Sequence, residues 1–246
     1  MKKLIFACSA AIVANTVVAE LMNMTPEVRA VRMKEFGGDI PDRRKQQGEI
    51  VIVNAQAAIA DGVITGGINR FVEDIHVGVR FEKGTFDVMK PDLRGTATLF
   101  VIADKNLPMT LVAPEAKWAV VNVEKLKSDK TAFFEARVRK ALYRVMGELC
   151  GASGTKYDGC IFGAMTKAED LDQIATAQMP IEYYERFAKY LPGIGIVPYR
   201  LVRYSKACQQ GWAPAPTNEY QKAVWDKVHE IPSNPIKIEF DPKKDK

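Results

Sequence analysis

Histidine is scarce in this chain of 246 residues, which contains two, His76 and His229. A catalytic zinc centre takes about three protein ligands of the His, Glu or Cys type and keeps one position open for water. His76 falls at the start of an expected strand and His229 at the end of an expected helix, so no helix carries two histidines at ligand spacing. The sequence therefore excludes a three-histidine zinc site.

Other catalytic patterns are also missing. The chain has no G-x-S-x-G nucleophile elbow,. Its glycines Gly62, Gly66 and Gly67 match neither the dinucleotide-binding nor the Walker phosphate loop, so they indicate helix packing against a sheet,. A cysteine–histidine nucleophile would need Cys208 beside one of the two histidines, and lone residues of these types are most often structural.

Long apolar runs are absent after the first 19 residues. The chain begins with two lysines, an apolar run of about 15 residues and the small-residue end Val17-Val18-Ala19, which is typical of a secretory signal peptide,. We therefore expect residues 1–19 to be removed and the mature chain to be periplasmic or extracellular, with no transmembrane segment. Removing two lysines and no acid lowers the net charge of +5 by two, to +3, a balance that does not indicate nucleic-acid binding,.

Few cysteines remain after that cleavage, namely Cys150, Cys160 and Cys208. Exported proteins form disulfides, and the two cysteines nearest in sequence are the plausible pair. The sequence thus predicts a Cys150–Cys160 disulfide, with Cys208 left buried or free.

The order of predicted elements indicates an α/β protein with helices packed on a mixed sheet. Residues 20–47 are predicted as a helical arm and linker, residues 48–192 as the α/β domain, and residues 193–246 as an extended arm with a short helix. β-Branched or alternating runs predict strands at 50–54, 76–81, 96–103, 111–113 and 118–123, and helical patterns cover 57–74, 130–150, 168–174, 180–191 and 218–229,.

The chain is organised around the predicted long helix 130–150 and the loop that follows it as far as Met165. Apolar residues recur on one stripe of the helix, and Gly151 ends it,. Arg137, Lys140 and Arg144 fall at three- and four-residue steps along one face,. Such a face either binds carboxylates, sulfates or phosphates or is an ordinary solvated surface.

This helix and loop resemble the metzincin zinc peptidases, and most of all the archaemetzincin type, over roughly residues 48–190. In the register fixed by Gly147, the family's three histidine positions fall on Lys140, Arg144 and Cys150, and its glutamate position on Ala141. The segment from Cys160 to Met165 is similar to the family's methionine turn. The resemblance implies a zincin-like fold that lacks both the zinc ligands and the general base, because Ala141 cannot take a proton.

These observations predict a binding or structural module, a pseudo-peptidase without metal or cofactor, whose partner is a protein, a peptide or an anionic ligand. The alternative is a secreted hydrolase or metallopeptidase with non-standard ligands. Glu148, Cys150, Asp158 and Cys160 could form such a set, although their spacing matches no zinc-site pattern,. A further candidate surface, Trp212, Tyr220 and Trp225 near the C-terminus, either docks a partner or packs against the domain, and packing is favoured.

Overall fold

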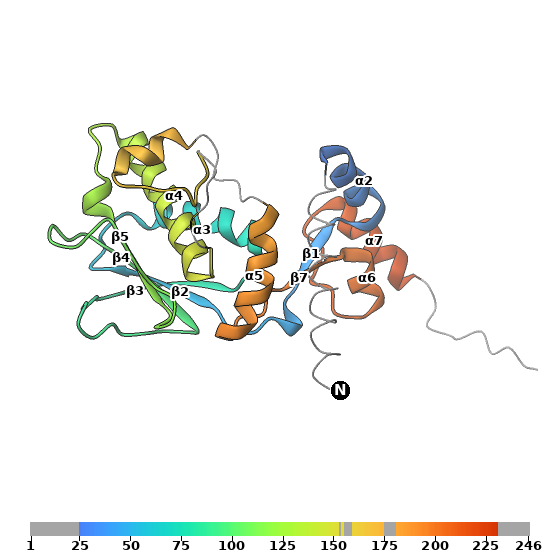
Figure 1. Cartoon of the computed structure of the whole chain (residues 1–246). Helices are drawn as coiled ribbons and strands as arrows, with labels where there is room; N and C mark the ends of the chain where they lie inside the picture. Colours follow the sequence, from blue (N-terminus) through green and yellow to red (C-terminus); the bar gives the residue numbers. More distant parts are fainter. Residues whose placement is uncertain (1–24, 153, 155–158, 175–180, 231–246) are drawn as a thin grey trace, which may run out of the picture. The chain divides into compact units, whose positions relative to one another are not determined.

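The computed structural model describes residues 25–152, 154, 159–174 and 181–230, which form two compact units (Figure 1). Unit 1 runs from Asp42 to Arg200, and unit 2 combines residues 25–41 with residues 201–230. The sequence predicted boundaries near residues 47 and 192 and two separate arms, whereas both terminal segments belong to one unit. The predicted signal peptide lies outside the described residues.

Unit 1 is built on a five-stranded mixed sheet. Its strands, in spatial order, are β3 (Val79–Gly84), β2 (Ile50–Ala55), β4 (Ala97–Ile102), β6 (Trp118–Asn122) and β5 (Thr110–Ala113). The first four are parallel, and β5 pairs antiparallel with β6 at one edge of the sheet. The predicted α/β class with a mixed sheet is confirmed.

Helices cover one face of this sheet, as Figure 1 shows for α3 (Asp61–Ile75) and α4 (Thr131–Leu149). Side chains of a strand alternate between the two faces of the sheet. Ile50 and Ile52 of β2 therefore lie in the core between the sheet and the helices, here called the helix-side core. Val51 and Val53 face the other way, where Phe86 and Trp118 pack against them. Both faces of the central strands are therefore buried, which explains their continuous apolar sequence.

The remaining elements of unit 1 are short, apart from one helix. They are η1 (Arg43–Lys45), η2 (Val123–Leu126), η3 (Ala168–Gln173) and α5 (Ile181–Ile194). The predicted long helix is confirmed as α4, in which Val138, Leu142 and Val145 are fully buried.

Two of the element ends that differ from the sequence prediction have a clear physical reason. The strand expected from residue 76 begins at Val79, because His76 adopts a left-handed conformation, φ 61°, and caps α3. Helix α5 continues through Pro192 to Ile194 and ends at Gly195, φ 90°. The Ile196 N–H then donates to the Leu191 carbonyl, as in a glycine-terminated helix end,.

Unit 2 contains the helices α2 (Pro26–Phe36), α6 (Tyr204–Gln209) and α7 (Glu219–His229), with strands β1 (Asp39–Asp42) and β7 (Arg200–Arg203) paired as a small sheet. Its core includes Tyr204, Cys208 and Val224, and Trp212 and Trp225 pack against it. Across both units, no helix among the described residues has the length and apolar character needed to span a bilayer.

Candidate functional site

The cationic face of α4 is directed at main-chain oxygens of the segments that follow it. Lys140 Nζ donates to the carbonyls of Leu171, 2.8 Å, and Ile174, 2.5 Å. Arg144 Nη1 donates to the carbonyls of Ile161, 2.8 Å, and Gly163, 2.6 Å. These two cations therefore fasten η3 and the loop after α4 to the helix.

Arg137, one turn before Lys140, is buried and is paired with Asp172 of η3. Its Nη2 lies 2.6 Å from Asp172 Oδ2, and its Nη1 donates to the Lys127 carbonyl. The hydrogen bond to Asp172 raises the pKa of Arg137, and the same bond lowers the pKa of Asp172. The prediction that Arg137, Lys140 and Arg144 bind an anion gains no support from these contacts, which are made to the protein itself.

The loop after α4 also packs directly on the helix at Gly147. A Cβ at this position would lie 2.4 Å from Cε1 of Phe162, which is fully buried. The Phe162 ring also contacts Tyr183, with ring centroids 4.6 Å apart. Met165 is half-buried and packs against the helix-side core. The methionine-turn-like loop is thus held by a close ring–glycine contact and by Arg144.

The positions that the metzincin resemblance assigns to zinc ligands do not fit a zinc ion. At those positions Lys140 and Arg144 present cations, and burial raises the pKa of the Cys150 thiol to about 12. Ala141, at the family's glutamate position, is buried and has no polar group. A zinc ligand needs a lone pair or a thiolate. Within the described ranges, no three His, Cys, Asp or Glu side chains gather as metal ligands, and Asp158 lies outside those ranges.

The predicted Cys150–Cys160 disulfide is not formed. All three cysteines of the described chain are free. Cys150 points into the helix-side core at the end of α4, whereas Cys160 is half-buried at its margin. A short sequence separation predicted the pair, but Cys150 is fully buried in this core, whereas Cys160 is only partly buried at its margin.

A pocket of about 370 Å³ lies beside the C-terminal end of α4. Four elements contribute to it: β5 and the turn after it, the end of α4, the loop that follows α4, and α5. Its lining residues are Val112, Pro114, Glu115, Glu148, Gly151, Ala152, Gly154 and Tyr190. The sequence had singled out Glu148 as a possible hydrolase or metal residue; it gave no signal for Glu115 or Tyr190, which enter the pocket through long-range folding.

Glu148 is the most buried acid of the pocket, with 20% of its side chain exposed, and Arg144 Nη2 lies 2.8 Å from its Oε1. Burial raises the pKa of Glu148, and the nearby guanidinium opposes this rise. Tyr190 packs on Gly151, where a Cβ would lie 2.6 Å from the ring. Burial and the charge of Glu115 raise the pKa of Tyr190. The pocket therefore combines two carboxylates with an aromatic side chain.

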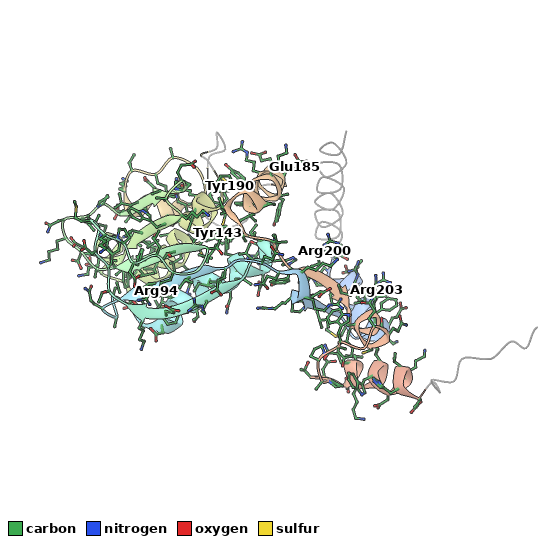
Figure 2. All side chains as sticks on the ribbon, turned by 90° about the horizontal axis from the view of Figure 1, so that it is seen from below. Arg94, Tyr143, Glu185, Tyr190, Arg200 and Arg203 are labelled. Carbon is green, nitrogen blue, oxygen red and sulfur yellow. The ribbon has the colours of Figure 1, made fainter. Side chains whose placement is uncertain are left out.

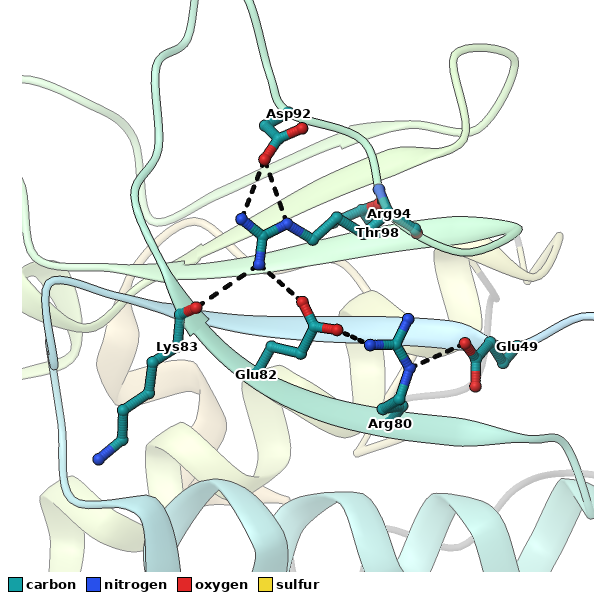
Figure 3. A network of polar contacts seen from close by, with 7 residues as sticks. All are labelled: Glu49, Arg80, Glu82, Lys83, Asp92, Arg94 and Thr98. Carbon is teal, nitrogen blue, oxygen red and sulfur yellow. Dashed lines mark hydrogen bonds and ion pairs between the residues drawn. The ribbon is translucent and has the colours of Figure 1, made fainter.

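The sheet has two edges, and the edge strand β3 is charged. Figure 3 shows Arg80 between Glu49 and Glu82, and Arg94 between Glu82 and Asp92. Charged side chains on an edge strand disfavour the addition of another strand. Figure 2 places Arg94 well apart from Tyr190 of the pocket. The β3 edge is thus protected by charge and lies away from the pocket.

The opposite edge strand, β5, carries no charge and is half-buried along its whole length. The Asn122 N–H donates to the Met109 carbonyl, so Met109 and Asn122 form a hydrogen-bonded pair. The same register places Leu111 opposite Val120. Hydrogen-bonded and non-hydrogen-bonded pairs alternate in antiparallel strands. The main-chain groups of Thr110 and Val112 therefore point away from β6, and no other strand of the described chain pairs with β5.

Together, the fold and the site define an α/β protein with an uncharged antiparallel edge strand beside an acidic pocket. No protein-family pattern and no curated protein matches the chain. Solved structures do match it, and they include archaemetzincins, the family that the sequence resembles. The archaemetzincin of Methanopyrus kandleri has 13% identity and a TM-score of 0.47, covering 58% of this chain and 95% of its own.

Two further matches have similar extents. The Archaeoglobus fulgidus archaemetzincin, solved with malonate, has 15% identity and a TM-score of 0.45, covering 56% of this chain and 99% of its own. A zinc-dependent peptidase from Methanocorpusculum labreanum has 13% identity and a TM-score of 0.44, covering 57% of this chain and 100% of its own. The similarity concerns chain path and comes with low identity.

Proposed function

We propose that this protein is an exported binding module that takes an extended polypeptide segment as an additional strand along β5, and that it does not act as a zinc peptidase. The observation that carries the proposal is the free edge of β5, where the N–H and C=O groups of Thr110 and Val112 point away from β6. Strand addition to an exposed edge gains main-chain hydrogen bonds, and pockets for alternate side chains supply specificity.

The pocket lies where such specificity would be needed. Val112 pairs with Ala119 and packs on the helix-side core, so it lies on the face of the sheet that α4 covers. Val112 also lines the pocket together with Glu148. Alternate side chains of a segment bound along β5 would therefore be directed toward α4, and one of them would enter the pocket.

Other residues support two further parts of the proposal, namely that the protein is not a zinc peptidase and that it is exported. Lys140 and Arg144 donate to main-chain carbonyls at positions where the family has zinc ligands, and Ala141 cannot serve as a base,. Residues 1–19 support export through their basic start, apolar run and small-residue end,.

Nuclear magnetic resonance of the ¹⁵N-labelled protein tests the proposal, with the blocked peptide acetyl-Thr-Val-Lys-Val-Thr-amide as the probe. We expect the amide signals of Thr110 and Val112 to shift with increasing peptide, while amides of β3 stay in place. Two N-methylated versions, one methylated at odd and one at even positions, distinguish strand addition from side-chain binding. One of them should lose binding at least about tenfold, because two or more main-chain hydrogen bonds are lost, and the other should retain it.

Unchanged β5 amides at millimolar peptide would refute the proposal. Equal binding of both N-methylated peptides would also refute it, since a strand uses its alternate N–H groups differently. Mass spectrometry of the same samples reports peptide cleavage. Cleaved peptide would favour the alternative of a hydrolase that uses Glu148.

A further inference from the structure

We infer that the pocket beside β5 selects a cationic side chain, of the lysine or arginine type, from the bound segment. This inference rests on the proposed function and adds the chemical class of the ligand. Glu148 from α4, Glu115 from the turn after β5 and Tyr190 from α5 all line the cavity. The contributions come from three elements that are distant in sequence.

The charges around the pocket leave it with an excess of negative charge. Arg144 pairs with Oε1 of Glu148, and no second cation pairs with this carboxylate in the described part of the chain. Arg144 is itself engaged by the carbonyls of Ile161 and Gly163, so it is fixed on the inner side of Glu148. Glu115 is exposed and adds a second negative charge. One arginine against two carboxylates favours a further cation.

The rest of the lining fits the shape of a long basic side chain. Val112 and Pro114 supply apolar surface for a methylene stem, and the carboxylates supply acceptors for its charged end,. Tyr190 is held in place by its packing on Gly151, and an aromatic ring of this kind attracts ammonium and guanidinium groups,. A carboxylate side chain would meet two like charges in the same space.

The test compares three blocked pentapeptides, acetyl-Thr-Val-X-Val-Thr-amide, in which X is lysine, norleucine or glutamate. Norleucine keeps the stem of lysine and lacks the ammonium group. We expect the lysine peptide to bind at least about tenfold more tightly than the norleucine peptide, because a charge-assisted hydrogen bond to a partly buried carboxylate is gained. The glutamate peptide should bind most weakly. Affinities come from the shifts of the Thr110 and Val112 amides.

Glu148→Gln should remove most of the preference for lysine over norleucine. Glu115→Gln is the second variant, because an exposed residue can be changed without affecting folding; it should reduce the preference by a smaller factor. Glu185→Gln is the matched control: Glu185 lies on the same helix as Tyr190, is exposed and does not line the pocket (Figure 2). It should leave the preference unchanged.

The outcomes separate this inference from the proposed function. If the lysine and norleucine peptides bind equally and both shift the β5 amides, the inference is wrong and the edge-strand proposal stands. If none of the peptides shifts those amides, the proposed function is wrong, and the inference that rests on it is wrong as well. A preference for lysine that persists in both Glu148→Gln and Glu115→Gln would also overturn the inference, because the selectivity would then arise elsewhere.

Discussion

Gly147 is the position at which the loop after α4 comes closest to the helix. We predict that Gly147→Ala destabilises the protein by about 1–3 kcal/mol, because the added methyl group would displace the buried Phe162 ring,. Alanine has a higher helix propensity than glycine by about 1 kcal/mol, and the overpacking exceeds this gain. Urea unfolding of wild type and variant gives the difference in the free energy of unfolding.

Gly62→Ala provides the matched control on another helix. Gly62 is exposed in the first turn of α3, and no atom lies within 4 Å of a Cβ built there. The same substitution should therefore leave stability unchanged or raise it by up to about 1 kcal/mol. Equal destabilisation at both glycines would contradict the role assigned to Phe162.

Single residues were predicted from sequence only where their spacing carried information. Three- and four-residue steps placed Arg137, Lys140 and Arg144 on one face of a helix. In the structure each of them donates to a segment that follows α4. Their acceptors could not be predicted, because most are main-chain carbonyls, which every residue possesses. Glu115 and Tyr190 were missed for a related reason: no local pattern marks residues that meet through folding.

At the scale of secondary-structure elements, Arg144 connects α4 to the loop that follows it. We predict that Arg144→Met destabilises the protein by about 2–4 kcal/mol, since two carbonyls lose their donor and Glu148 loses its counter-charge,. Differential scanning calorimetry and urea unfolding measure the loss. In combination with Glu148→Gln the cost should be less than the sum of the single changes, because the unpaired carboxylate is then absent.

Arg139→Met on the same helix separates this effect from a general loss of charge. Arg139 is half exposed and pairs with Glu135 four residues earlier. Exposed pairs of this type contribute about 0.3–0.5 kcal/mol, so the change should be small. A similar loss of stability in both variants would show that Arg144 does not hold the loop through its specific contacts.

Elements were predictable from sequence in their middles and less so at their ends. The buried strands β2, β4 and β6 and the long helix α4 follow from apolar periodicity, which is set by burial,. The predicted strand start at His76 and the predicted helix end before Pro192 were wrong, because tertiary contacts decide where these elements begin and end. His76 takes a left-handed cap conformation that its residue type rarely adopts, and Pro192 is accommodated within the last turn of α5.

For the whole molecule, the division into units was the least predictable feature. Composition predicted an N-terminal arm and a C-terminal arm, but both belong to unit 2, where α2 packs with α7 and β1 pairs with β7. These contacts join residues separated by more than 150 positions in the sequence. Periodicity reports which residues are buried and does not report which distant segment buries them.

The pH dependence of unit 1 follows from His76, whose ring is buried and stacks on Tyr199 with centroids 5.1 Å apart. The Arg43 guanidinium lies over the same Tyr199 ring, and the Glu73 carbonyl faces the imidazole. Burial lowers the pKa of His76 below its ordinary value of 6.5. As the pH falls below 6.5, the unfolded chain takes up a proton that the folded chain resists, so stability decreases until the pH reaches the lowered pKa.

We therefore predict that the free energy of unfolding of unit 1 decreases below pH 6.5, by at most about 1.4 kcal/mol per pH unit from this group. Hydrogen exchange of peptides from β2 and β4, measured by mass spectrometry, follows unit 1 by itself. His76→Asn should flatten this component, since asparagine tolerates the left-handed conformation and does not titrate. His229→Asn replaces the surface histidine of unit 2 and should leave the pH dependence as in wild type.

Buried acids of raised pKa, such as Asp74 and Glu148, act in the opposite direction on acidification. The quantity that tests the prediction is therefore the difference in pH dependence between wild type and His76→Asn. An identical pH profile for these two proteins would show that His76 is protonated as easily in the folded chain as in the unfolded one.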